Sequence, residues 1–163
     1  SVRAWDLDFR LLDRGRFEAD VLQFGTDEAQ LARARFNRHL QQKGDPPLGM
    51  RTVVIPADGS QDFLWRGQRV TSRSLMVFPE QAELESLSGP DFDVYTLSLR
   101  SELVEVVAES LEIPLLDALM RGKETVELPY QTMRELRQSA HEICIRVRGE
   151  PGWLSLPGFQ TRL

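Results

Sequence analysis

The chain has 163 residues, of which 41% are hydrophobic and 28% charged, a balance typical of a globular domain with a substantial core. Its formal net charge is −5, whereas free-standing DNA-binding proteins carry a basic surplus that neutralises phosphates, so specific DNA binding by this chain alone is not expected. The single cysteine, Cys144, excludes an internal disulfide and favours a cytoplasmic protein, and no apolar run has the length of a membrane-spanning helix.

Short strands are predicted along the first two-thirds of the sequence. Apolar residues alternate with polar ones around Phe17, Ala19 and Val21, with the period of two that a half-buried strand requires. Further apolar runs are separated by turn signals rich in Gly, Pro, Asp and Ser, and one pair flanks a predicted hairpin turn at residues 66–67. These further strands are expected at residues 51–56, 63–65, 68–70, 74–78 and 92–99. Many short strands at regular spacing indicate a sandwich or barrel.

The segment 27–43 has two interpretations. It has good helix propensity and a possible N-cap at Thr26. As a strand, it places mostly apolar side chains on one face, namely Ala32, Ala34, Phe36, Arg38 and Leu40. Propensity alone favours the helix.

Helices are predicted after Leu99. Ser101 can cap a first helix that extends to about Leu111, Pro114 can begin a second one over 114–121, and a third is expected over 130–147. The third helix has an apolar stripe made of Met133, Leu136, Ala140, Ile143 and Val147. The Gly- and Pro-rich residues 150–163 are interpreted as a linker.

The sequence contains no recognisable catalytic or metal-binding motif. His39 and His141 lie far apart along the chain, and no further metal-binding spacing accompanies them. Cys144 lies between two isoleucines in a predicted helix, where an inert buried thiol is expected. We therefore expect no catalytic residue, no metal site, no cofactor and no enzymatic activity.

The basic residues Arg33, Arg35 and Arg38 also have two interpretations. They can form a charged face in contact with solvent, which is the commoner role of such a stretch. Alternatively, one of them points inward and holds an anionic or carbonyl-bearing ligand.

An ordered series of short motifs carries a family resemblance. Gly44-Asp45-Pro46-Pro47-x-Gly49 precedes RTVVIP, and then come FLWRG from Phe63, SLMVFP from Ser74 and FDVYTLS from Phe92. This series resembles the N-terminal regulatory domain of AraC/XylS-type transcription regulators. The resemblance covers roughly residues 17–111 well, and the helices that follow in outline.

The resemblance implies a mainly β fold with C-terminal helices: a cupin-like jelly-roll barrel over 1–99, a helical segment that packs on it over 100–149, and a linker over 150–163. In this family the barrel senses a small effector, the helices often form a homodimer, and a helix-turn-helix domain that would follow this chain binds DNA. The histidine and glutamate motif of metal-binding cupins is absent here, which puts cupin enzymology in doubt. The resemblance also favours a strand over 31–41.

Candidate site residues follow from that strand. Its more apolar face should point into the barrel, which would direct Arg38 toward a ligand, and the aromatic residues of other strands should line the same cavity. We therefore predict a ligand site formed by Phe36, Arg38, Trp65 and Tyr95. A location of Arg38 at the barrel rim, with its charge in water, is the alternative.

A dimer interface is predicted on the third helix, through Met133, Leu136 and Ala140. The alternative is that the helices simply pack on the barrel wall. Two other functions stay open at this point, a cupin-fold enzyme and a barrel that binds no ligand and serves only in protein contacts.

Overall fold

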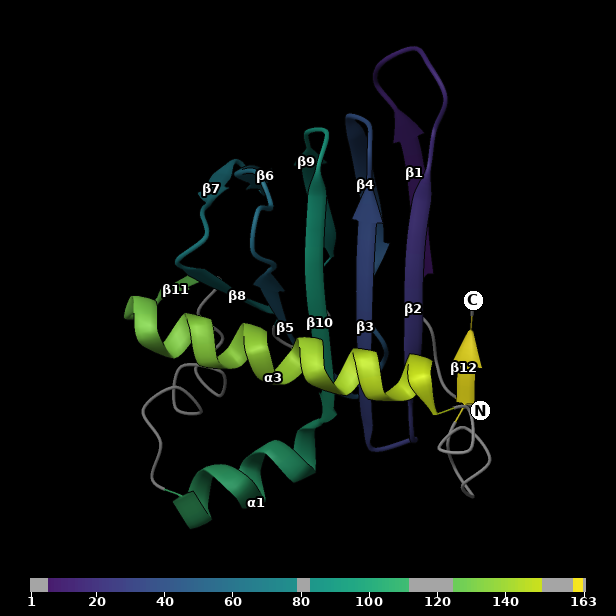
Figure 1. Ribbon diagram of the computed structural model, residues 1–163. Helices are drawn as coiled ribbons and strands as arrows, with labels where there is room; N and C mark the ends of the chain where they lie inside the picture. Colours follow the sequence, from purple (N-terminus) through teal and green to yellow (C-terminus); the bar gives the residue numbers. More distant parts are fainter. Residues whose placement is uncertain (1–5, 79–82, 112–124, 151–159, 163) are drawn as a thin grey trace.

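The described residues of the protein form two antiparallel sheets and two helices. The computed structural model describes residues 6–78, 83–111, 125–150 and 160–162 (Figure 1). One sheet has five strands, in the order β1 (Asp6–Leu11), β4 (Leu40–Asp45), β9 (Leu84–Ser88), β6 (Phe63–Trp65) and β7 (Gln68–Val70). The other has seven, in the order β11 (Thr125–Glu127), β8 (Ser74–Phe78), β5 (Met50–Pro56), β10 (Phe92–Arg100), β3 (Ala29–Phe36), β2 (Ala19–Gly25) and β12 (Gln160–Arg162). The helices are α1 (Ser101–Leu111) and α3 (Tyr130–Gly149).

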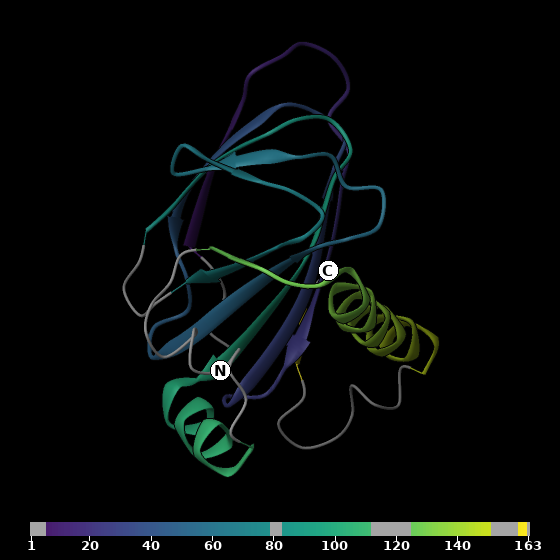
Figure 2. The same ribbon diagram turned by 90° about the vertical axis from the view of Figure 1, so that its left-hand side faces the viewer.

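The molecule is layered. The two sheets face each other, and α3 lies across the outer face of the seven-stranded sheet, running over β5, β10, β3 and β2 (Figures 1 and 2). The helix α1 follows β10 directly and lies at one end of the same sheet. The predicted class, mainly β with C-terminal helices, is confirmed as a sandwich-like arrangement.

The strand pairs are nested along the chain. β6 pairs with β7, β5 with β8, β4 with β9 and β3 with β10, each antiparallel. Eight consecutive strands therefore behave like one long hairpin that is folded over so that its pairs alternate between the two sheets.

Several predicted strands are confirmed. The runs at 51–56 and 92–99 form most of β5 and β10, and those at 63–65, 68–70 and 74–78 form β6, β7 and β8. The turn between β6 and β7 has positive φ at both central residues, 46° at Arg66 and 76° at Gly67. This is the backbone conformation of a tight hairpin turn whose twist matches that of its strands.

The prediction of one strand over 31–41 is wrong. β3 ends at Phe36 and β4 begins at Leu40, so the chain crosses from one sheet to the other between them. Asn37 supports the end of β3, because its side-chain oxygen accepts a hydrogen bond from the Glu18 backbone N–H and its own N–H donates to the Glu18 carbonyl. The helix alternative is also excluded, since β3 is paired on both sides, with β2 and β10.

The two outer predicted helices are confirmed as α1 and α3, and the helix predicted over 114–121 lies outside the described residues. The segment expected to be helical also contains β11, which pairs with β8. Within the expected linker, β12 pairs with β2 along the edge of the seven-stranded sheet.

Both faces of the seven-stranded sheet are buried, which creates two separate cores. The outer core lies between the sheet and α3, and includes Leu22, Phe24, Ile55, Val77, Tyr95, Met133, Ala140 and Cys144. The inner core lies between the two sheets, and includes Phe36, Leu40, Val54, Phe63, Trp65, Met76, Phe78, Leu84, Phe92 and Val94. Because neighbouring residues of a strand point to opposite faces, each strand of this sheet contributes alternately to the two cores.

Candidate ligand-binding cavity

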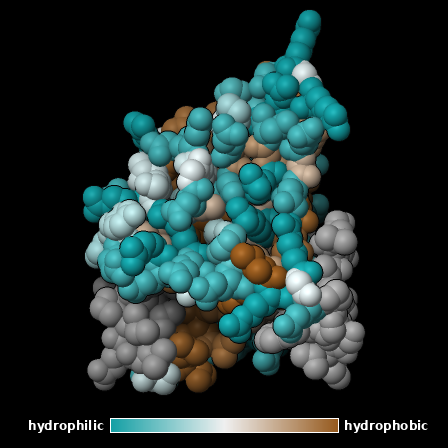
Figure 3. All heavy atoms as spheres, in the orientation of Figure 1, coloured by the Kyte–Doolittle hydropathy of each residue, from teal (hydrophilic) through white to brown (hydrophobic). Residues whose placement is uncertain are grey.

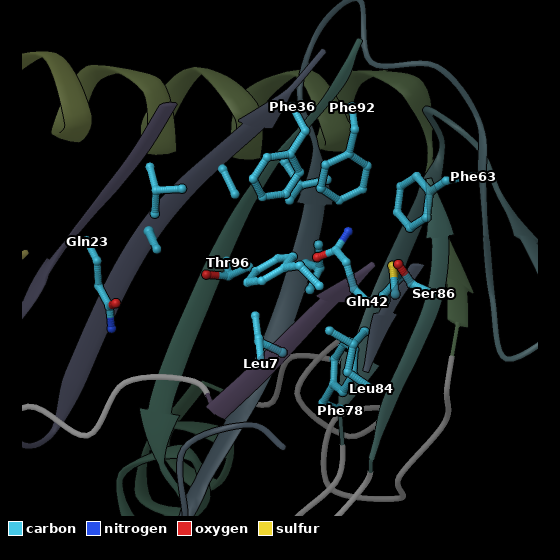
Figure 4. Close-up of a pocket in the computed structure, with 17 residues that line it drawn as sticks. Leu7, Gln23, Phe36, Gln42, Phe63, Phe78, Leu84, Ser86, Phe92 and Thr96 are labelled. Atoms are coloured by element: carbon cyan, nitrogen blue, oxygen red, sulfur yellow. The ribbon is translucent and has the colours of Figure 1, made fainter. Parts of the chain in front are cut away.

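A cavity of about 300 Å³ lies within the inner core. Most of the described side chains that line it are aliphatic or aromatic, and none of these is charged. The lining residues are Leu7, Phe9, Val21, Gln23, Ala32, Ala34, Phe36, Gln42, Val54, Phe63, Met76, Phe78, Leu84, Ser86, Phe92, Val94 and Thr96 (Figure 4). A concave apolar site with a few polar groups is the usual form of a small-molecule pocket.

Strand alternation explains how β3 and β10 build one wall. The inward side chains of β3 include Ala32 and Ala34, which are small, and the register places Ala34 opposite Val94 of β10. The small side chains leave space that larger residues at these positions would fill. The cavity therefore follows from short side chains on a central strand.

Aromatic rings gather at one end of the cavity. The rings of Phe36 and Phe92 are stacked, with centroids 5.6 Å apart and an interplanar angle of 7°. Phe63 meets Phe92 edge to face at 5.1 Å, and Phe9 meets Phe36 edge to face at 5.8 Å. Such pairs hold one another in position, so this end offers a preformed aromatic surface.

The polar side chains of the described residues in the lining are two amides and two hydroxyls, those of Gln23, Gln42, Ser86 and Thr96. Gln42 is buried, and its amide lies among the apolar lining residues in Figure 4. Its Nε2 donates to Ser88 Oγ at 3.4 Å, near the long limit for a hydrogen bond. Among the described residues, Gln42 Oε1 accepts no hydrogen bond.

Two lining residues mark the mouth of the cavity. Phe9 on β1 is 51% exposed and Val21 on β2 is 42% exposed, although both also line the cavity. β1 is an edge strand of the five-stranded sheet, and β2 lies near the edge of the other sheet. The cavity therefore opens between these two strands, on the side of the molecule away from β7 and β8.

Two of the four predicted ligand-site residues belong to the inner core. Phe36 lines the cavity, as described above. Trp65 is fully buried beside Phe78, with ring centroids 4.7 Å apart, but it is not among the lining residues. Its indole N–H has no hydrogen-bond partner among the described residues.

Arg38 does not point into the inner core. It lies in the crossing between β3 and β4, where its Nε donates to the Arg16 carbonyl at 3.1 Å and its guanidinium packs against Gly15. Phe36 and Arg38 were expected on the same face of one strand. They do not share a face, because β3 ends at Phe36 and the regular alternation of its side chains ends there too. Arg38 is partly exposed in this crossing and is not among the residues that line the cavity.

Tyr95 lies on the opposite face of the sheet from the cavity. Its hydroxyl contacts Nδ1 of His141 on α3 at 3.1 Å, and its ring lies 5.1 Å from the Arg33 guanidinium. Arg33 in turn forms two hydrogen bonds with Asp93, at 2.7 and 3.0 Å. Burial raises the pKa of Tyr95, so its hydroxyl stays protonated in this contact.

The three residues predicted at a dimer interface pack inside the chain. Met133 is fully buried, Ala140 is 6% exposed and Leu136 is partly buried, all against the outer core. The alternative, in which the helix packs on the wall of the sheet, describes α3. Its outward surface is largely hydrophilic (Figure 3), although Ile143 and Ile145 are exposed on it.

An arginine that the sequence did not single out fixes α3 to the sheet. Arg137 is buried, its Nε donates to the Pro56 carbonyl at 2.6 Å, and its Nη2 donates to the Ser72 carbonyl. Its Nη1 also lies 3.3 Å from the Asp58 carboxylate. Arg137 follows Met133 by four residues, so the two side chains lie on the same face of the helix. This spacing was the signal by which the sequence could have placed Arg137 on the buried face.

Sequence reasoning also missed the lining residues on β1, β4 and β9. The alternation Leu7, Phe9, Leu11 was a signal for β1, and Leu84, Ser86, Ser88 was a weaker one for β9. Gln42 had no signal of its own, because its inward direction depends on where β4 begins.

Within the described parts of the chain, no group of three or more His, Cys, Asp or Glu side chains is arranged to hold a metal ion. None of the described helices combines the length and apolar character needed to cross a membrane. Comparison with known proteins gives no match: no family model, no curated protein and no solved structure is significantly similar to this chain.

Proposed function

We propose that this chain is the effector-sensing domain of a cytoplasmic transcription regulator of the AraC/XylS type, and that its effector binds in the cavity between the two sheets. The observation that carries the proposal is this cavity, which is open at one side and whose described lining is mostly apolar and uncharged. In the proposal the chain is not an enzyme, and DNA is bound only by a separate domain that would be linked to its C-terminal side.

The strand order supports a cupin-like jelly roll. A jelly roll arises when a long antiparallel hairpin is rolled up so that its nested pairs alternate between two sheets. The pairing of β3 with β10, β4 with β9, β5 with β8 and β6 with β7 has this pattern. This is the finer fold that the family resemblance implies.

The chemistry of the lining supports binding over catalysis. Acid–base and nucleophilic catalysis need a titratable or activated group near the reacting atoms. The described polar side chains that line the cavity are two carboxamides and two hydroxyls, and the described lining contains no histidine, carboxylate or thiol. Such groups orient a ligand through hydrogen bonds without transferring protons at neutral pH.

β10 offers a route from the cavity to the helices. Val94 and Thr96 line the cavity, whereas Tyr95 between them contacts His141 on α3. The same strand continues directly into α1 at Ser101. A ligand that binds two arrangements of β10 with different affinities would therefore shift the positions of both helices.

Pairing of two chains is part of the proposal, because symmetric regulators match paired DNA half-sites. The interface would use other residues than Met133, Leu136 and Ala140, which the outer core already buries. Sedimentation of the chain at high micromolar concentration measures the state directly, and a monomer there would count against pairing through this domain.

The coding sequence downstream of Leu163 tests the regulator assignment. A helix-turn-helix domain encoded there is the expected result. A stop codon, or a domain of another class, would contradict it. The chain by itself is expected to show no sequence-specific DNA binding in an anisotropy assay at physiological salt.

A further inference from the structure

We propose that the cavity selects a neutral molecule of two fused rings, or of similar size, that carries one hydroxyl or N–H group, and that Gln42 recognises this group. The inference rests on the proposed function, in which the cavity is the effector site. It adds the chemical class of the ligand and the residue that reads its polar group.

The volume sets the size of the ligand. An apolar protein cavity of about 150 Å³ is large enough to bind benzene. The cavity here, at about 300 Å³, has roughly twice that volume, which fits two fused rings. It lies at the lower end of the range for small-molecule sites, so larger molecules would have to extend through the mouth between β1 and β2.

The lining sets the charge. Among the described residues, no Lys, Arg, Asp, Glu or His side chain borders the cavity. A carboxylate or ammonium group placed there would lose its hydration without gaining an opposite charge, which costs several kcal/mol. The arginine predicted for this role, Arg38, is engaged with the Arg16 carbonyl outside the inner core. An uncharged ligand is therefore favoured over an anionic one.

The aromatic end sets the shape. Phe36 and Phe92 lie nearly parallel and Phe63 meets Phe92 edge to face, so the rings form a surface that is already in position before a ligand arrives. Flat rings gain the most from such a surface through offset stacking and edge-to-face contacts. A planar ligand can lie against this surface and reach Gln42 with a substituent.

Gln42 supplies the specific polar contact. Its Oε1 accepts no hydrogen bond from any described residue, and the 3.4 Å bond from its Nε2 to Ser88 is weak enough to be exchanged for a bond to a ligand. The side chain is buried, with the whole residue only 4% exposed, so this unused acceptor lies in a largely apolar region. A ligand hydroxyl can donate to Oε1 and thereby satisfy it.

The experiment compares the binding of two neutral naphthalenes and one anionic naphthalene to the intact chain. Dissociation constants for naphthalene, 2-naphthol and 2-naphthoate are measured by naphthyl fluorescence. We expect 2-naphthol to bind roughly threefold to tenfold more tightly than naphthalene, which is the effect of one net hydrogen bond. We expect 2-naphthoate to bind most weakly of the three.

Two neighbouring glutamines provide the variant and its matched control. Gln42 lines the cavity, whereas Gln41, the preceding residue of the same strand, points to the other face of the five-stranded sheet. In Gln42→Leu the preference for 2-naphthol over naphthalene should disappear, and in Gln41→Leu it should persist. Retained naphthalene binding shows that Gln42→Leu is folded, and Gln42→Met serves if it is not.

Different results would contradict different parts of the proposal. Binding of naphthalene and 2-naphthol with equal affinity, or an equal loss of preference in both variants, would overturn the role of Gln42 and leave the cavity as an effector site. Tightest binding of 2-naphthoate would overturn the neutral class alone. If none of the three binds at its solubility limit, the inference and the proposed effector site both fail.

Discussion

The outer and inner cores use the same seven-stranded sheet but fill their space differently. On the outer face, α3 places Met133, Ala140 and Cys144 against the strands, and the core is packed. On the inner face, the small residues Ala32 and Ala34 leave a cavity that no other side chain of the described residues fills. The size of alternate residues along one strand therefore decides which face of the sheet is structural and which can bind a ligand.

The polar groups of the outer and inner cores also differ. In the outer core, Arg137 meets two carbonyls and a carboxylate, Arg33 is paired with Asp93, and Tyr95 contacts His141. In the inner core, the Gln42 acceptor receives no hydrogen bond from the part of the chain that the structure describes. Satisfied polar groups stabilise a fold, whereas an unused one in an apolar site is available for recognition.

The largest expected effect comes from removing volume in the outer core. Met133→Ala should lower the free energy of unfolding by about 2–5 kcal/mol, because the fully buried side chain leaves a cavity that rigid neighbours cannot close. Ile145→Ala on the outward side of α3, where the side chain is 55% exposed, is the control and should change it by less than about 0.5 kcal/mol. Denaturant unfolding measures both, and equal effects would show that α3 is not packed as described.

Arg137→Met tests the polar attachment of α3. The Pro56 and Ser72 carbonyls would lose their donor, so the free energy of unfolding should fall by about 1–3 kcal/mol. Arg134→Met, at an exposed position of the same helix, should leave it nearly unchanged. A neutral effect of Arg137→Met would mean that water replaces the guanidinium at these carbonyls.

A larger side chain should have different effects on the two faces of the seven-stranded sheet. Ala34→Leu fills part of the inner cavity and should change the free energy of unfolding by less than about 1 kcal/mol, while weakening 2-naphthol binding at least tenfold. Ala140→Leu adds the same atoms to the packed outer core and should cost about 1–3 kcal/mol. If the two substitutions have equal effects on stability, the contrast between the cores is wrong.

The smallest expected change is in the pH dependence of the unfolding free energy, and it comes from Cys144 in the outer core. Burial raises the pKa of its thiol, so ionisation is less favourable in the folded chain than in the unfolded one. The stability from this group is fully present below the ordinary thiol pKa of about 8.5 and is lost as the pH rises through the higher folded pKa. Between pH 7 and 10 the unfolding free energy should therefore decline less in Cys144→Val than in the unaltered chain. Parallel pH profiles of the two proteins would contradict a raised pKa of the Cys144 thiol.

The sequence was a good guide to most strands and to both described helices, and a poor one to the cavity. Apolar runs predicted β5, β8 and β10 because buried strands need them. They could not say which face is inward, since all five residues of β8 are buried and alternation is lost. The same ambiguity placed Tyr95 in the cavity, although it faces α3.

The crossing between β3 and β4 was the main obstacle. No Gly or Pro interrupts the sequence from Leu31 to Gln41, so nothing local indicates that the chain changes sheets after Phe36. The ladders on either side determine the break, because β3 pairs with β2 and β10 whereas β4 pairs with β1 and β9. Such long-range pairing could not be predicted from local propensity, and it also decides the directions of Arg38 and Gln42.

A methyl NMR titration of the intact chain with 2-naphthol tests directly whether ligands bind in the inner core. Neighbouring residues on β5 and β8 report on opposite faces: Val54 and Met76 line the cavity, whereas Ile55 and Val77 belong to the outer core. We predict saturable shifts at Val54 and Met76 that exceed those at Ile55 and Val77. Larger shifts in the outer core, or shifts confined to exposed methyl groups such as that of Val106, would contradict it.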